Sequence, residues 1–205
     1  GLLFECYCSR RDIREAASAA HAPPGHYPGT CLRLSEREAR RRRAELADRG
    51  LRPALRLRPT AENWTVTDMG RGRFTGPTDS AVLQRGDGAF AYNLAVVVDD
   101  IAMGVDQVVR ADDLLASSPL QAYLTHELGG IEPVYGHVPL VRGPTGRRLA
   151  KRDGAVTLSE LHEAGLSTAD VVQMLAESLG LGGVLSTAGF LENFAQARMT
   201  GNPWT

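Results

Sequence analysis

The chain has few cysteines and no long apolar run. Its 205 residues include three cysteines, an odd number, so complete intramolecular disulfide pairing is impossible. All three fall within residues 6–31, and this clustering indicates reduced thiols in an intracellular, cytoplasmic protein. No apolar run approaches the roughly 18 residues that a membrane-spanning helix needs, and no secretory signal opens the chain.

An excess of charge of one sign is also lacking. The 23 basic and 24 acidic residues give a net charge of -1, so bulk charge does not point to a nucleic-acid partner. Hydrophobic residues make up 43% and charged residues 23%, as in ordinary globular proteins. The length suits one domain with a full core, or a core with a small satellite. The chain does not begin with methionine, and we expect a further segment upstream.

The first third of the chain predicts two helices and then short strands. Ser9 is a suitable N-cap for a helix over residues 9–20, which would end before a Pro/Gly-rich loop. Ser35 begins a second helix, with Glu38 in the capping-box position and Gly50 as its stop. Short strands are predicted after it, separated by turn residues: 54–58, 64–68 and 80–85.

In the rest of the chain, segments with the apolar spacing of strands alternate with segments that have the spacing of helices. After the apolar run "LAVVV", the patterns predict a strand over 106–110, a helix over 118–128, a strand near 137–141 and further helices toward the end. Strands that alternate with helices are typical of an α/β fold, with a parallel sheet covered by helices.

The cysteine spacing is compatible with a metal site. Cys6 and Cys8 form a C-x-C pair, and Cys31 follows a Pro/Gly-rich loop. That loop holds candidates for a fourth ligand of tetrahedral zinc: His21, His26 and Tyr27. Three or four protein ligands would leave little room for an activated water, so the role would be structural. The alternative is that the thiols are small buried hydrophobes.

Basic residues gather on the second predicted helix, at Arg37 and at residues 40–43, interleaved with glutamates. A solvated, salt-bridged face is the simpler interpretation, and an RNA-backbone contact is the alternative. Trp64, near Arg56 and Arg58, is interpreted as a packing residue rather than a base-stacking platform.

Two further segments carry candidate substrate contacts. Arg110 would close a strand, where it could bind a carboxylate bidentately beside the Tyr92 hydroxyl, or simply pair with Asp112 or Asp113. The segment "GPTGRRLAKRDGAVTL" presents four cations that could clamp a polyphosphate or form an ordinary exposed basic loop: Arg147, Arg148, Lys151 and Arg152.

The ordered motifs "YNLAVVVDD", "VVRADDLL", "HVPL" and "RLAKRDGA" resemble the second half of the catalytic domain of glutamate-specific class I aminoacyl-tRNA synthetases. "RLAKR" is similar to the KMSKS loop of that family, with Arg148 and Ala150 replacing its first lysine and its serine, and Lys151 retained. The resemblance covers essentially the whole chain. It implies an α/β fold: half of a Rossmann-type catalytic domain, a small zinc-binding connective insertion and C-terminal helices.

The same resemblance implies boundaries and roles. Residues 1–90 would form the zinc-binding and connective region, 91–150 the second catalytic half, and 151–205 the KMSKS-like loop and helical stem-contact region. Tyr92 and Arg110 would bind glutamate. Lys151 would bind ATP and act catalytically, by stabilising charge on the pyrophosphate leaving group together with Mg²⁺.

Within the family, the glutamyl-Q tRNA(Asp) synthetase branch is most similar. Its zinc site reads C-x-C followed by Tyr-x-x-x-Cys, which implies the ligands Cys6, Cys8, Tyr27 and Cys31. Only about fifty residues follow Lys151, too few for the anticodon-binding domain of ordinary glutamyl-tRNA synthetases, and "GNPWT" is typical of a natural end. The branch implies a monomer that transfers glutamate to the queuosine base of tRNA(Asp).

One family motif has no counterpart here. The HIGH motif would lie upstream of Gly1, so we expect this chain alone to activate glutamate poorly or not at all. Two alternatives stay open: a fragment of an ordinary glutamyl-tRNA synthetase, and a non-catalytic, zinc-stabilised RNA-binding remnant.

Overall fold

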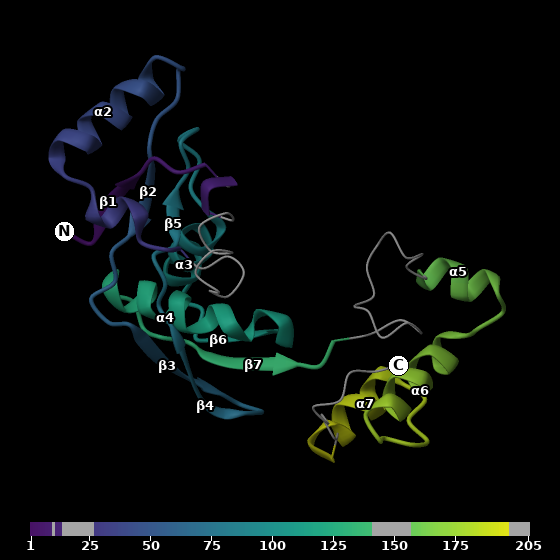
Figure 1. The fold of residues 1–205 in the computed structure, drawn as a ribbon. Coiled ribbons are helices and arrows are strands. Elements are labelled where there is room, and N and C mark those ends of the chain that lie inside the picture. Colours follow the sequence, from purple (N-terminus) through teal and green to yellow (C-terminus); the bar gives the residue numbers. More distant parts are fainter. Residues whose placement is uncertain (10, 14–26, 141–156, 197–205) are drawn as a thin grey trace. The chain divides into compact units, whose positions relative to one another are not determined.

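The computed structural model describes residues 1–9, 11–13, 27–140 and 157–196 (Figure 1). The chain divides into two compact units. Unit 1 comprises Gly1–Val108 and Ala116–Tyr135, and unit 2 comprises Val109–Leu115 and Gly136–Thr205. The boundaries at residues 90 and 150 that the sequence suggests remain a prediction.

A three-stranded antiparallel sheet carries the cysteine region of unit 1. Its strands are β1 (Leu3–Cys6), β2 (Ala54–Leu57) and β5 (Val82–Gln84), in the order β1-β2-β5. The pairing of β2 with β5 shifts register between Leu55 and Arg56. Strand side chains normally alternate between faces, yet the neighbours Arg56 and Leu57 are both buried beside this shift. A simple alternating pattern therefore cannot identify Arg56 as an interior residue.

A second sheet has the strand order β4-β3-β7-β6. It contains β3 (Asn63–Asp68), β4 (Gly72–Pro77), β6 (Gln107–Ala111) and β7 (Val134–Val138). The expected parallel pairing holds for β3 and β7, whereas β3 and β4 form an antiparallel hairpin. Asp68 shapes that hairpin turn because its carboxylate accepts hydrogen bonds from the backbone N–H groups of Gly70 and Arg71, both at 2.9 Å.

The predicted strands at 54–58, 64–68, 80–85 and 106–110 are confirmed as β2, β3, β5 and β6. The strand predicted near 137–141 is displaced, since β7 begins at Val134 and ends at Val138. Pro139 follows it, and proline has no N–H to continue a strand ladder. Strands β1 and β4 had no predicted counterpart.

Helix starts follow their capping residues. Ser9 Oγ accepts from Asp12 N–H at 3.2 Å, and residues 11–13 are helical; the remainder of that predicted helix lies outside the described residues. Helix α2 (Glu36–Ala47) has the full capping box of Ser35 and Glu38. The "LAVVV" run lies inside α3 (Tyr92–Met103), which ends at Gly104 in the left-handed conformation.

Helix α4 (Ser118–Glu127) confirms the helix predicted over 118–128, and its first eight residues are buried. On one side it contributes to a cluster with strand and α3 residues: Leu57, Leu83, Val97, Leu120, Tyr123 and Leu124. On another, Ala122 packs with Val66 and Tyr135 of the second sheet, as Figure 1 shows for α4 and that sheet. Helix α4 is thus the centre of the unit 1 core.

Unit 2 contains the predicted C-terminal helices. These are α5 (Leu158–Glu163), α6 (Thr168–Ser178), α7 (Thr187–Asn193) and the short η4 (Phe194–Gln196). Thr157 and Ser167 provide capping boxes for α5 and α6. A small core packs α6 with the segment that follows it, and Phe190 of α7 lies against this core: Val172, Ala176, Leu181 and Val184. In the described part of the chain, no helix has the length and apolarity required to cross a bilayer.

Candidate metal centre and substrate residues

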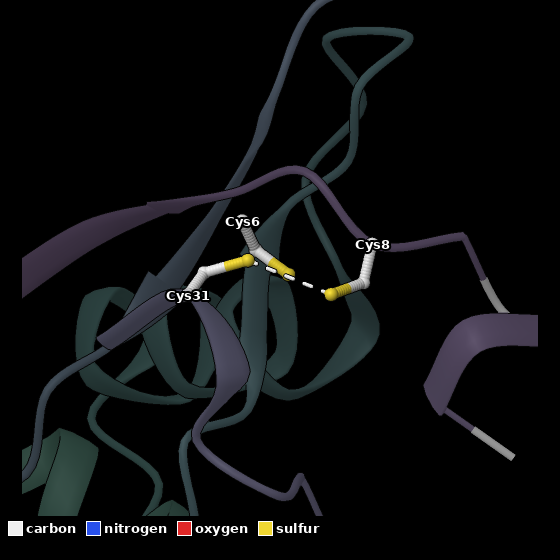
Figure 2. Close-up of side chains that lie close together, drawn as sticks. All are labelled: Cys6, Cys8 and Cys31. Atoms are coloured by element: carbon white, nitrogen blue, oxygen red, sulfur yellow. Dashed lines mark hydrogen bonds between the residues drawn. The ribbon is translucent and has the colours of Figure 1, made fainter. Parts of the chain in front are cut away.

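Three cysteine sulfur atoms meet beside the end of β1. Cys6 closes that strand, Cys8 follows two residues later, and Cys31 lies in the short helix η1 (Thr30–Arg33). Their Sγ atoms all lie within 4.8 Å of one another, and the Cys8 and Cys31 sulfurs are 3.5 Å apart. Figure 2 shows the three side chains directed toward a common point. All three are free cysteines.

Tyr27 brings an oxygen donor to the same place. Its Oη lies 3.7 Å from Cys6 Sγ and accepts a hydrogen bond from the Cys31 backbone N–H at 2.8 Å. The Tyr27 side chain is buried, and its ring packs against Phe4 with centroids 5.9 Å apart. Cys31 Sγ in turn accepts from the Tyr7 N–H at 3.4 Å. The structure therefore brings together the four residues that the resemblance implied as ligands.

This donor set fits tetrahedral zinc. With Zn–S bonds of about 2.3 Å, tetrahedral geometry places two thiolate sulfurs about 3.8 Å apart, close to the 3.5 Å between Cys8 and Cys31. Three sulfurs and one oxygen suit a borderline-soft ion. His21 and His26, the other candidate ligands, lie outside the described residues.

The cluster also has the electrostatics of a cation site. Hydrogen bonds from Cys31 and Cys8 lower the pKa of the Cys6 thiol, whereas contacts with Cys31 and Cys6 raise the pKa of the Cys8 thiol. Burial, followed by the contact with Cys31, raises the pKa of Tyr27. A bound cation would favour loss of the thiol protons.

Arg56 packs directly on this centre. Its Cζ lies 4.1 Å from the centroid of the Tyr27 ring, and its Nη1 donates to the Ser80 carbonyl at 2.6 Å. The residue is only 7% exposed, and its buried Nε has no hydrogen-bond partner in the part of the chain that the structure describes. Sequence reasoning considered Arg56 only as a neighbour of Trp64 and did not connect it with the cysteines.

Helix α2 is fixed to β1 by an ion pair. Arg43 donates to the Glu5 carboxylate from Nη2 at 2.6 Å and from Nε at 3.0 Å, and Tyr7 Oη donates to the same oxygen. Burial raises the pKa of Glu5, but the hydrogen bonds from Tyr7 and Arg43 outweigh it and leave that pKa lowered. Two further pairs lie along the helix: Arg40 with Glu36 and Arg41 with Glu45. No α2 residue is buried, so the expected solvated, salt-bridged face is confirmed.

Trp64 is a packing residue, as expected. Its ring meets the Tyr123 ring edge-on with centroids 5.3 Å apart, and its Nε1 donates to Glu132 at 3.0 Å. It packs against the two core clusters to which helix α4 contributes.

Arg110, the predicted glutamate ligand, is oriented by two acceptors within unit 2. Its Nε donates to His137 Nε2 at 3.1 Å, and its Nη2 donates to the Leu114 carbonyl at 3.2 Å. His137 is buried in β7 and must keep Nε2 unprotonated to accept this bond. In the sequence, His137 was noted only within the motif "HVPL" and was not paired with Arg110. Pairing of Arg110 with Asp112 or Asp113 stays open.

The other predicted substrate residues are Tyr92 and Lys151. Tyr92 is the first residue of α3, belongs to unit 1 and is 66% exposed. Lys151 and its loop neighbours Arg147, Arg148 and Arg152 lie outside the described residues. The roles of Tyr92, Arg110 and Lys151 therefore remain predictions.

Residues 1–195 match the sequence profile described as "tRNA synthetases class I (E and Q), catalytic domain". The chain belongs to this class I synthetase family. Family membership agrees with the motif-based resemblance and places the cysteine cluster and Arg110 in a synthetase catalytic domain.

Named relatives of this synthetase family divide into two groups. The glutamyl-Q tRNA(Asp) synthetase of Nocardia farcinica is 52% identical over all of this chain and 64% of its own length. That of Cutibacterium acnes is 45% identical over 94% of this chain and 54% of its length. Glutamate–tRNA ligase 2 of Alkalilimnicola ehrlichii is 40% identical over 84% of this chain and 37% of its own length. The chain thus spans less than two thirds of each relative.

Solved synthetase structures share the fold. The glutamate-tRNA synthetase of Elizabethkingia anophelis superposes with a TM-score of 0.74 at 19% identity, covering 100% of this chain and 48% of that one. The expected fold class, mixed α/β of the class I synthetase type, is confirmed.

Proposed function

We propose that this chain is part of an ATP-dependent enzyme that activates glutamate and transfers it to the queuosine base of tRNA(Asp). The observation that carries the proposal is the convergence of Cys6, Cys8, Tyr27 and Cys31, the pattern by which the sequence resembles the glutamyl-Q branch. The 52% identity to a protein of that name supports the same assignment. We further propose a cytoplasmic monomer.

The first step would be adenylate formation. A glutamate carboxylate oxygen attacks the α-phosphorus of Mg²⁺-bound ATP in line, a P–O bond forms, and the bond to pyrophosphate breaks. Lys151 would neutralise the charge that develops on the leaving pyrophosphate, as cationic groups do in phosphoryl transfer. In the second step a nucleophile of the queuosine base attacks the activated carbonyl carbon and releases AMP.

Recognition of glutamate would fall to Tyr92 and Arg110. A guanidinium binds a carboxylate bidentately through paired N–H donors, and the contacts of Arg110 to His137 and Leu114 hold its side chain in one orientation. The exposed position of Tyr92 at the start of α3 leaves its hydroxyl accessible to a ligand. Orientation before the reaction is the main contribution that such binding groups make to rate.

The metal would have a structural role. Cys6, Cys8, Tyr27 and Cys31 would hold Zn²⁺, which would cross-link the end of β1 to η1. Apparent binding free energies for structural zinc are on the order of 10 kcal/mol, enough to decide whether this region folds.

A glutamate–tRNA ligase is the second candidate, favoured by the relative in Alkalilimnicola ehrlichii. The two candidate functions differ in the RNA that accepts glutamate. The product of the complete gene should be charged with radiolabelled glutamate on three RNAs: tRNA(Asp) with queuosine, tRNA(Asp) without it, and tRNA(Glu). Our proposal predicts label only on the first; label on tRNA(Glu) would establish the ligase, and label on none would contradict both.

A further inference from the structure

Arg56 is a buried cation that pairs with no anion among the described residues. The guanidinium of arginine is a cation. The residue is 7% exposed, and within the described part of the chain its side chain donates one hydrogen bond, to the neutral Ser80 carbonyl. Among the residues that the structure describes, no ion pair includes Arg56, and its Nε has no hydrogen-bond partner. A buried charge is strongly unfavourable unless an opposite charge lies nearby.

The adjacent donor set would supply that opposite charge once a metal is bound. Three thiolates and Zn²⁺ sum to a net charge of -1, even when Tyr27 binds as a neutral phenol. The guanidinium lies over the ring of Tyr27, the residue whose oxygen reaches toward Cys6. A cation over an aromatic face is attracted by the ring quadrupole, more strongly where water is excluded.

We propose that Arg56 is the counter-charge and positioning residue of the metal centre. Stacked on the Tyr27 ring and held from its other side by Ser80, it keeps the phenol oxygen directed to the sulfurs and neutralises the excess negative charge of the loaded centre. The inference rests on the proposed zinc site, and on no assumption about glutamate or tRNA.

Arg58, two residues after Arg56 in the chain, provides a matched control. It lies just past β2 and also covers an aromatic ring, with its Cζ 5.7 Å from the centroid of Phe4. Unlike Arg56, it is exposed, and the ring that it covers is not that of a proposed metal ligand. Comparing the two separates a role at the metal from a general arginine–aromatic contact.

The test uses the 205-residue chain with Arg56→Met, Arg56→Lys or Arg58→Met. Zinc affinity is measured by competition with a chromophoric chelator, and the thermal midpoint is measured with and without Zn²⁺. Loss of a residue that supports metal ligands typically weakens binding 10- to 100-fold, so we expect about that loss for Arg56→Met and less than about a twofold change for Arg58→Met. Arg56→Lys keeps the charge without the planar stack and should fall between them.

The thermal midpoints distinguish this role from simple packing. Arg56→Met should lower the midpoint of the zinc-loaded chain but not that of the metal-free chain, where the buried charge has no counter-charge to lose. If Arg56→Met lowered the thermal midpoint equally with and without zinc, the inference would be overturned. Unchanged zinc affinity in this variant would also overturn it. If Arg56→Met does not fold, wild-type affinity in Arg56→Lys would overturn the stacking role.

The same experiments distinguish a failure of the role proposed for Arg56 from a failure of the proposed zinc site or of the proposed enzymatic activity. Failure of the unsubstituted chain to bind zinc would overturn the metal site and the role of Arg56 together. Zinc binding that depends on Arg56, in an enzyme that does not use glutamate, would leave the inference standing and reject the proposed activity.

Discussion

The metal centre and the substrate residues differ in how the chain builds them. Cys6, Cys8, Tyr27 and Cys31 come from 26 consecutive residues and meet within unit 1. Tyr92 belongs to unit 1 and Arg110 to unit 2, and Lys151 lies outside the described residues. A metal site can be specified by local spacing, whereas a substrate crevice depends on segments far apart in the chain. Stability should therefore depend on the first region and catalysis on the second.

The largest expected effect comes from removing a metal ligand. Cys31→Ser should abolish stoichiometric zinc binding and lower the thermal midpoint strongly, because the binding energy of a structural zinc is also folding energy. Zinc content by atomic spectroscopy and thermal unfolding with and without a chelator measure this. Tyr7→Phe is the control, since it keeps the backbone N–H that donates to Cys31. Full zinc content in Cys31→Ser would remove this residue from the ligand set.

Lys151→Ala should reduce activity and leave zinc binding and stability unchanged. Removing one group that stabilises transition-state charge typically costs 10²- to 10³-fold in rate, so we expect a loss of about that size in glutamate-dependent ATP–pyrophosphate exchange by the complete gene product. Zinc content and thermal midpoint should not change. A rate within threefold of the parent enzyme would exclude the proposed role of Lys151.

A smaller effect is expected at His137. His137→Ala removes the acceptor for Arg110 Nε, and hydrogen bonds to charged groups are worth about 1.5–3 kcal/mol, so KM for glutamate should rise about tenfold or more. His137→Gln offers an amide oxygen as acceptor and should recover part of the loss. Steady-state kinetics would show the effect in KM rather than in kcat. A fall in kcat alone would argue against a positioning role.

The smallest effect concerns the tie between α2 and β1. Arg43→Ala should lower the thermal midpoint at pH 7 by no more than a few degrees, because exposed ion pairs contribute little. The pKa of Glu5 is lowered in the folded chain, so its contribution is present above the unfolded value of about 4.3 and is lost as the pH falls through the folded value. The midpoint difference from the parent should therefore shrink on acidification. Arg40→Ala, which breaks a pair within α2 only, provides the comparison.

Local signals in the sequence predicted local structure well. The capping residues Ser9 and Ser35 mark helix starts that the structure confirms, because a hydroxyl accepts from the N–H three residues on. The spacing of the cysteines, with Tyr27 added by the family resemblance, likewise identified residues that meet in space. The zinc itself stays a prediction.

Other features depend on long-range pairing that no local pattern reveals. The register shift at Arg56 buries a charged residue in a short strand. Strand β4 begins with Gly72 and contains Gly76, so its composition does not predict a strand; its pairing with β3 forms it. The bond between Arg110 and His137 joins two strands that are separated by α4 in the chain.

Glutamate-dependent ATP–pyrophosphate exchange by the product of the complete gene, with and without tRNA, tests the proposed activity most directly. The resemblance implies that ordinary glutamyl-tRNA synthetases need tRNA to activate glutamate, whereas the glutamyl-Q branch does not. We predict exchange in the absence of tRNA. Exchange only in its presence would contradict the glutamyl-Q assignment in favour of the ligase, and no exchange under either condition would contradict enzymatic activation of glutamate altogether.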